Sequence, residues 1–169
     1  MNKFRLTKRF ISFLLAFTFL FANTLTAFAA ASSVSLESQK KKYGDVWEDQ
    51  QTPGWPAYQC QGFAVRMKYE TGGKAVSTWK KIYTTDNLKD VKAGDIIRYT
   101  IKSTSTTDLH TIFIISVNSD ASTIKFADAN YDYNNGIRWE VTMNTTLRNR
   151  IVTSINDEGT NANPTYIWR

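Results

Sequence analysis

The sequence predicts a single α+β domain, in which an N-terminal helix carrying a cysteine packs on an antiparallel β-sheet. Residues 57–70 have apolar side chains at helical spacing. Four later segments, residues 95–101, 110–117, 124–132 and 137–143, are rich in β-branched and aromatic residues, as strands are. About 140 residues follow an N-terminal leader, enough for one compact core.

Residues 1–30 have the features of a signal peptide. Four basic residues precede an uncharged apolar run at residues 10–21, and Ala27-Phe28-Ala29 offers a small-x-small cleavage site. The run is too short for a comfortable membrane span. We therefore expect a secreted protein, extracellular or associated with the cell wall, with no stable membrane insertion after the leader is removed.

The net charge does not indicate nucleic-acid binding. The chain has 21 basic and 15 acidic residues, but four of the basic residues lie in the leader. The remainder has 17 basic and 15 acidic residues, a formal balance of +2. An excess this small is no basis for nucleic-acid recognition. We expect no nucleic-acid partner, and we expect a monomer.

An N-terminal segment, residues 31–53, precedes the domain that we place at residues 54–169. Its first part, residues 31–39, is small and polar and is expected to be frayed. The charge run at residues 40–45 is expected to be a solvated surface rather than a site. Two prolines and a glycine within residues 51–56 indicate a turn before the helix.

The helix predicted over residues 57–70 carries the only cysteine of the chain, Cys60. This residue falls near the N-terminal end, where the helix dipole and free amides stabilise a thiolate and can hold an oxyanion. Gly62 is expected to leave room beside the sulfur for a substrate backbone. The alternative is that Cys60 is a buried apolar residue, because Phe63 and Met67 share its helix face.

The only histidine, His110, opens a predicted strand. If residues 118–122 form a five-residue turn, the numbers of paired residues in this strand and the next sum to 240. His110 then lies opposite Asn130, and alternation places Asp128 on the same face. A slip of one residue would move both partners to the other face. Further on, Asn135-Gly136 predicts a tight hairpin.

An imidazole base needs a partner that fixes its tautomer and stabilises its protonated form. Asp128 or Asn130 would do this through one ring nitrogen of His110. The other nitrogen would face Cys60 and take its proton, giving a thiolate–imidazolium pair. The alternative is that these are ordinary polar residues at strand ends.

Four segments carry a family signature in a fixed order. They are residues 58–64 (YQCQGFA), 91–97 (VKAGDII), 110–115 (HTIFII) and 128–130 (DAN). Together they resemble CHAP domains, the cysteine, histidine-dependent amidohydrolase/peptidase domains related to the NlpC/P60 group and to papain-like folds. The resemblance covers residues 54–139. It implies a papain-like fold with Cys60 as nucleophile, His110 as base, and Asp128 or Asn130 as the orienting residue, where the family usually has Glu. It also implies cleavage of peptidoglycan amide bonds.

Large aromatic residues mostly build the core of a small domain, but some stack on sugar rings. Trp55, Tyr58 and Trp79 are the candidate substrate-binding residues. No cofactor is expected. One cysteine and one histidine cannot build a zinc site in the usual way, and Asp45 and Asp49 are too few carboxylates for a calcium site.

Three functions remain open on the sequence. The first is a secreted amidase or endopeptidase that cleaves peptidoglycan, or another cell-wall peptide, through an acyl-thioester. The second is a catalytically inactive domain of the same fold that binds the wall. The third is a secreted cysteine protease or toxin that acts on a non-wall amide. A reactive thiol would favour the first and third over the second.

Overall fold

The computed structural model describes residues 32–72, 76–82, 88–101, 109–156 and 166–169. The expected signal peptide lies outside these residues. Within them, helices cover a sheet whose strand pairs are all antiparallel, so the α+β class is confirmed. No helix of the described part is long and apolar enough to cross a membrane.

In the described residues the sheet has seven strands, of which six follow the order β2-β7-β3-β4-β5-β6 and the seventh, β1, pairs with β4 outside this order. The strands are β1 Ser32–Ser33, β2 Lys81–Ile82, β3 Ile96–Thr100, β4 Leu109–Val117, β5 Ile124–Ala129, β6 Ile137–Thr142 and β7 Tyr166–Trp168. The four predicted strands are confirmed, β5 being three residues shorter than expected. β1, β2 and β7 were not predicted, because strands this short carry no periodic signal.

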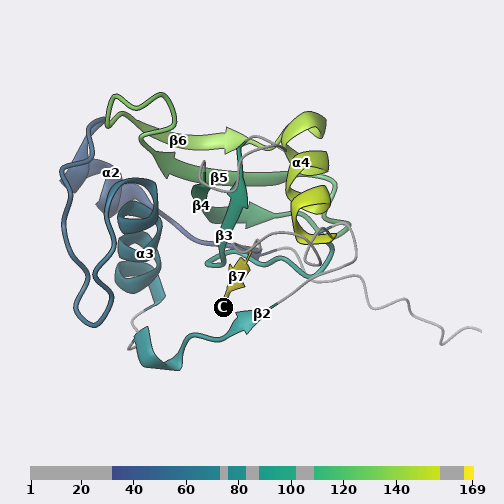
Figure 1. Ribbon diagram of the computed structural model, residues 1–169, viewed down its shortest axis with the longest axis horizontal. Helices are drawn as coiled ribbons and strands as arrows, with labels where there is room; N and C mark the ends of the chain where they lie inside the picture. The colour runs from purple at the N-terminus through teal and green to yellow at the C-terminus, as the bar shows by residue number, and fades with distance from the viewer. Residues whose placement is uncertain (1–31, 73–75, 83–87, 102–108, 157–165) are drawn as a thin grey trace, which may run out of the picture.

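Three α-helices and one 3₁₀ turn accompany the sheet in the part of the chain that the structure describes. They are α2 Glu37–Tyr43, α3 Gln59–Gly72, η1 Val76–Thr78 and α4 Thr145–Asn156. The predicted cysteine-bearing helix is confirmed as α3, shifted by two residues. Figure 1 shows α3 and α4 set well apart on the sheet, with η1 and β2 following beyond the C-terminal end of α3.

Alternation along the strands gives the sheet two apolar faces. On one face, Phe63 and Met67 of α3 pack with Phe113 of β4. On the other face, Ile151 of α4 packs with Ile112, the neighbour of Phe113 along β4. The sheet is thus covered on both sides, which explains why residues on both faces of β4 are buried.

The N-terminal segment is part of the fold rather than a frayed end. Ser32 pairs with Val117, and Leu36 and Trp47 are both buried. The prediction of a frayed segment is therefore wrong from residue 32 onward. The composition of the segment is polar, but two large apolar side chains are enough to hold it on the domain.

The β4–β5 register matches the expected one near His110. Phe113 pairs with Ala127, so paired numbers sum to 240 there, whereas Val117 pairs with Ile124 instead of residue 123. One extra residue in β4, Ile115, separates the two registers as a bulge. The turn is one residue longer than predicted, and the bulge compensates for that difference.

The tight hairpin predicted at Asn135-Gly136 is wrong. β5 ends at Ala129 and β6 begins at Ile137, so the loop spans residues 130–136. Three of its residues, Asn130, Tyr133 and Asn135, have left-handed backbone conformations with φ of 60°, 59° and 58°. Side-chain and backbone hydrogen bonds from these polar residues favour this wider loop over a two-residue turn.

Candidate active site

Cys60 is the second residue of α3, and its position is set by the residue before it. Gln59 has a φ of 51°, and its amide donates a hydrogen bond of 2.6 Å to Oδ1 of Asp49. The same oxygen accepts from Nε1 of buried Trp47 at 3.1 Å. The carboxylate of Asp49 therefore holds the start of the helix, a role that the sequence analysis missed because it weighed Asp49 only as a calcium ligand.

Gly62 serves the packing of this helix start. A Cβ at this position would lie 2.6 Å from the carbonyl oxygen of Ala57, so only glycine lets the two backbones approach this closely. The expectation that Gly62 leaves space for a substrate is wrong, because backbone atoms fill that space.

The sulfur of Cys60 lies over the first residues of β4. Its Sγ is 4.0 Å from the carbonyl oxygen of Leu109, and the residue keeps 9% of its surface exposed. Burial raises the pKa of the thiol, but hydrogen bonding and charge interaction with His110, together with contacts to Thr111, lower the pKa below its usual value. The thiol is therefore placed for ionisation rather than for simple apolar packing.

His110 is buried and bound on one side by a carboxylate. Its Nε2 lies 2.8 Å from Oδ2 of Asp128, and the two side chains are 2% and 0% exposed. Burial lowers the pKa of His110, but the interactions with Asp128 and Cys60 raise it to about 9. With Nε2 engaged by Asp128, Nδ1 is the nitrogen left for the thiol. The rings of Tyr99 and Tyr131 contact the imidazole edge-to-face, at 5.9 and 5.4 Å between centroids.

Asp128 is shared between His110 and Arg138. Nε of Arg138 donates to Oδ1 at 2.8 Å, and its Nη2 donates to Oδ2 at 2.5 Å, which makes the pair bidentate. Burial raises the pKa of Asp128, but the hydrogen bonds from Arg138 and His110 lower it below its ordinary value. The guanidinium of Arg138 also lies 3.7 Å over the Tyr131 ring.

Arg138 was missed by the sequence analysis because the loop between β5 and β6 is longer than the predicted two-residue turn. Ala129 pairs with Ile137 directly after this loop, and the same register sets Asp128 opposite Arg138. A bulge follows farther along β6, where Phe126 pairs with Val141. Glu140, within the bulge, has a φ of 56°. No feature of the sequence indicates a bulge at a non-glycine residue.

Asn130 takes a different place from the one expected. Its Oδ1 accepts from the amide of Asn135 at 3.1 Å, and its own amide donates to the carbonyl of Gly136 at 2.9 Å. The side chain therefore closes the β5–β6 loop, whereas His110 interacts with Cys60, Asp128, Tyr99 and Tyr131. Of the two orienting candidates, the structure brings only Asp128 to the imidazole.

A second arginine, Arg98 in β3, lies close enough to Cys60 to interact with it electrostatically. NH1 of Arg98 donates to Oε1 of Gln61 at 2.7 Å and to the hydroxyl of Thr111 at 3.3 Å. Burial lowers the pKa of Arg98, and the charge of Cys60 raises it. Arg98 is the only charged residue of the strand β3, which is otherwise largely buried, and this could have marked it as a functional candidate from the sequence.

No family model, curated protein or solved structure matches this chain.

The three candidate substrate-binding aromatics do not form one groove beside Cys60. Tyr58 is 56% exposed two residues before the cysteine, and its hydroxyl accepts from Gln51. Trp55 and Trp79 pack together with 5.8 Å between ring centroids. Trp79 also lies 5.2 Å from Nζ of Lys68, in the C-terminal half of α3. Tyr58 thus remains beside the cysteine, whereas Trp79 lies toward the other end of the helix.

The arrangement can support acyl-transfer chemistry by a thiol. A nucleophile with a lowered pKa, a base with a raised pKa and a buried carboxylate that orients the base are present together. In the described part of the chain, no three His, Cys, Asp or Glu side chains gather as metal ligands. The carboxylate of Asp49, one of the two weighed for calcium, is engaged by Gln59 and Trp47.

Proposed function

We propose that this protein is a secreted cysteine amidase or endopeptidase with a papain-like fold, and that it cleaves amide bonds in peptidoglycan. The observation that supports it most is the buried series Cys60, His110 and Asp128, in which Nε2 of the imidazole is 2.8 Å from the carboxylate. A structural cysteine in an apolar site would have a raised pKa, whereas the interactions of Cys60 lower it.

In the proposed reaction, the thiolate of Cys60 attacks the carbonyl carbon of the amide and forms a carbon–sulfur bond. The imidazolium of His110 gives its proton to the leaving amine as the carbon–nitrogen bond breaks. A water molecule then enters, and neutral His110 takes one of its protons. The resulting hydroxide attacks the thioester and the carbon–sulfur bond breaks, which releases a carboxylic acid and restores the thiolate–imidazolium pair. The acid then gives its proton to the solvent and leaves as a carboxylate.

Asp128 and Arg138 support this cycle without touching the substrate. Asp128 fixes the tautomer of His110 and stabilises the imidazolium. Arg138 holds both oxygens of that carboxylate, so the carboxylate cannot rotate away from the ring. Arg98 adds positive charge near the sulfur, which favours the thiolate.

The choice of peptidoglycan rests on the sequence signature at residues 58–64, 91–97, 110–115 and 128–130 and on the signal-peptide features of residues 1–30. The sequence offers no preference between the sugar–peptide amide and amides within the peptide. Fragment masses identify the bond directly.

The first test uses the fact that Cys60 is the only cysteine. Alkylation by iodoacetamide then reports one group, and its rate is measured against pH in the folded and the urea-unfolded protein. We expect the folded protein to react at a lower pH than the unfolded one, and His110→Gln to remove this difference. A folded thiol that reacts only at the pH of the unfolded one, or not at all, contradicts the proposal and favours the inactive binding module.

The second test is incubation of the exported form with purified sacculi of several chemotypes, beside Cys60→Ala. Soluble fragments released by the wild type and absent with Cys60→Ala support the proposal, and mass spectrometry names the cleaved bond. A reactive thiol without fragments from any wall rejects peptidoglycan and favours a non-wall amide. Retention of both proteins on walls without fragments favours the binding module.

A further inference from the structure

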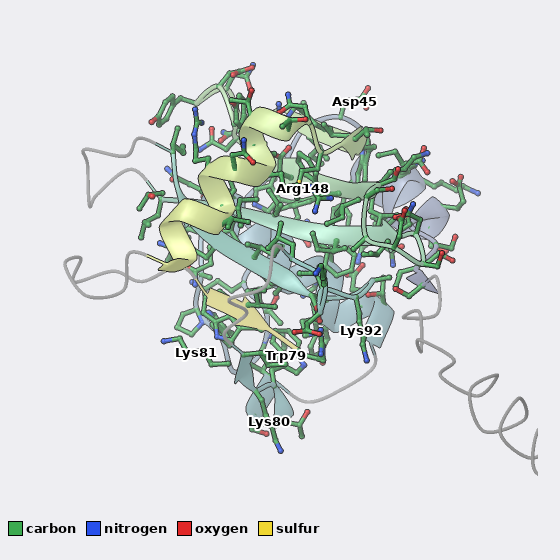
Figure 2. The ribbon with its side chains drawn as sticks, turned by 90° about the vertical axis from the view of Figure 1, so that its right-hand side faces the viewer. Asp45, Trp79, Lys80, Lys81, Lys92 and Arg148 are labelled. Atoms are coloured by element: carbon green, nitrogen blue, oxygen red, sulfur yellow. The ribbon has the colours of Figure 1, made fainter. Side chains whose placement is uncertain are left out.

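A cavity lies at the end of α3 away from Cys60. It has a volume of about 680 Å³, within the usual range for ligand sites. Trp79 and Ile82 contribute apolar surface, and the positive side chains around it are Lys68, Lys80, Lys92 and Arg169. We call this cavity the basic groove. In Figure 2, Trp79, Lys80, Lys81 and Lys92 gather in the lower part of the molecule, well away from the Asp45 label.

The positive groups of the basic groove differ in what they already bind. The guanidinium of Arg169 holds Asp95 through two hydrogen bonds of 3.0 and 2.7 Å. Nζ of Lys68 donates to the carbonyl of Gly94 at 2.7 Å. Lys80 and Lys92 are exposed, and among the described residues neither ammonium has an ion-pair partner. Two ammonium groups from different segments of the chain are thus available to a ligand.

The basic groove is separate from the proposed catalytic groups. Lys68 follows Cys60 by eight residues on the same helix, which is a rise of roughly 12 Å. Asp95, at the groove, precedes β3, whereas Tyr99 near the other end of β3 pairs with His110. The sheet and α3 therefore present the two regions at opposite ends, so that a change in one leaves the other in place.

We propose that the basic groove binds an anionic chain of polyol or sugar units joined by phosphodiesters. Lysine binds phosphate as a point charge, whereas planar carboxylates favour arginine, and the arginine of this groove is already paired with Asp95. Trp79 supplies an apolar wall for the neutral units between the phosphates. The volume exceeds what a single phosphate fills, and Lys80 and Lys92 lie on separate segments, so the ligand reaches more than one cation.

The test is binding of the exported protein to a fluorescent ten-unit poly(glycerol phosphate), measured by anisotropy at low salt. The variant Lys80→Glu/Lys92→Glu reverses the two available charges. Its control is Lys41→Glu/Lys125→Glu, which makes the same change at exposed lysines in α2 and β5. We expect the groove variant to bind about tenfold or more weakly and the control to stay within about twofold.

Equal loss in both variants overturns the proposal, because the binding then follows net charge alone. Binding of phosphatidylglycerol vesicles without binding of the soluble oligomer also overturns it, in favour of a membrane surface. Competition by inorganic phosphate as efficient as by the oligomer would reduce the groove to a site for a single anion and contradict the chain proposal. Trp79→Phe, which keeps an aromatic wall, is expected to bind more weakly with unchanged unfolding temperature.

The outcome is independent of the catalytic proposal. Alkylation of Cys60 and release of wall fragments report the catalytic end of α3, and the anisotropy assay requires neither. We expect Lys80→Glu/Lys92→Glu to keep the thiol reactivity of the wild type, and Cys60→Ala to keep full binding of the oligomer. A loss of thiol reactivity in the groove variant would show that the two regions are not separate.

Discussion

Two aspartates in this protein are held by arginines in almost the same way. Asp128 is bound at both oxygens by Arg138, and Asp95 is bound at both oxygens by Arg169. The carboxylates are 0% and 2% exposed, and the arginines 35% and 34%. The pairs differ in the third partner, which is the imidazole of His110 for Asp128 and the backbone amide of Lys92 for Asp95.

The comparison shows that the role of a buried ion pair depends on the third group that its carboxylate binds. Asp95 joins Arg169, just after β7, to the turn before β3, so its contribution is to the fold. Asp128 makes an equivalent pair, but its remaining capacity as an acceptor is directed at the imidazole of His110, which can take up and release a proton. The Asp95 pair is therefore an internal control for the Asp128 pair.

Removing the carboxylates gives the largest expected contrast. Asp128→Ala leaves His110 without its orienting partner. The kcat/KM for the release of fragments from walls is expected to fall by about 10³- to 10⁴-fold. Asp95→Ala is expected to keep kcat/KM within about twofold while losing about 2 to 3 kcal/mol of unfolding free energy in urea. Comparable loss of turnover in both folded variants would show that the third partner is irrelevant.

Removing the arginines is expected to have a smaller effect of the same kind. Arg138→Met frees the Asp128 carboxylate to rotate, and kcat is expected to fall about 10- to 100-fold with little change in KM. Arg169 binds Asp95, which has no contact with His110, so Arg169→Met is expected to leave kcat unchanged. Arg138→Lys, which keeps the charge but not the bidentate geometry, is expected to recover only part of the loss.

The pH dependence separates the two carboxylates further. Interactions with Asp128 and Cys60 raise the pKa of His110 to about 9, so the protonated ring is lost, and activity falls, as the pH passes that value. We expect Asp128→Asn to move this falling limb to lower pH and Asp95→Asn to leave it in place. If the falling limb of the pH profile stays in place in Asp128→Asn, the loss of activity at high pH is due to the titration of a group other than His110.

The same shift affects stability. The folded pKa of His110 lies above its ordinary value of about 6.5, so its interactions contribute fully below that pH and are lost as the pH rises toward 9. The lowered pKa of Asp128 has the opposite sense, because its contribution is present above about pH 4 and is lost in acid. Thermal unfolding of wild type and His110→Gln between pH 7 and 10 checks the first of these, since only the wild type should lose stability.

The smallest expected effect concerns Tyr99, which touches His110 without a polar contact. Its ring lies edge-to-face with the imidazole, and its buried hydroxyl has no hydrogen-bond partner among the described residues. Tyr99→Phe removes an unsatisfied polar group, so we expect stability to be unchanged or to rise by up to about 1 kcal/mol. Activity should stay within about twofold, and a larger loss would give this hydroxyl a role that its contacts do not indicate.

The sequence was sufficient to predict the elements that bring the thiol and the imidazole together. Cys60 on a helix, His110 at a strand start and Asp128 on the next strand follow from side-chain periodicity and alternation. The register of His110 was obtained from a turn one residue too short, and it holds near His110 because the bulge at Ile115 restores it. Two local features that are invisible in the sequence thus cancelled.

Arg138 could not be found in this way. A two-residue turn at Asn135-Gly136 would place Asp128 opposite Met143, but the seven-residue loop places it opposite Arg138. This loop depends on left-handed conformations at non-glycine residues, which tertiary packing imposes and local propensity opposes. The position of Trp79 was missed for a related reason, since distance along the sequence does not show which end of α3 it reaches.

The place of β7 in the sheet has a consequence for the timing of activity. This strand is the last of the described elements in the chain, yet it lies between β2 and β3, where Ile167 pairs with Ile82 and Ile97. A chain exported from its N-terminus delivers Cys60 early and residues 166–168 late. Tyr99 of β3 pairs with His110, and until β7 is in place β3 lacks one of its two neighbouring strands. The proposed hydrolase would thus gain its activity only after the whole domain has left the cell, and a chain truncated before Tyr166 that still cleaved walls would contradict this delay.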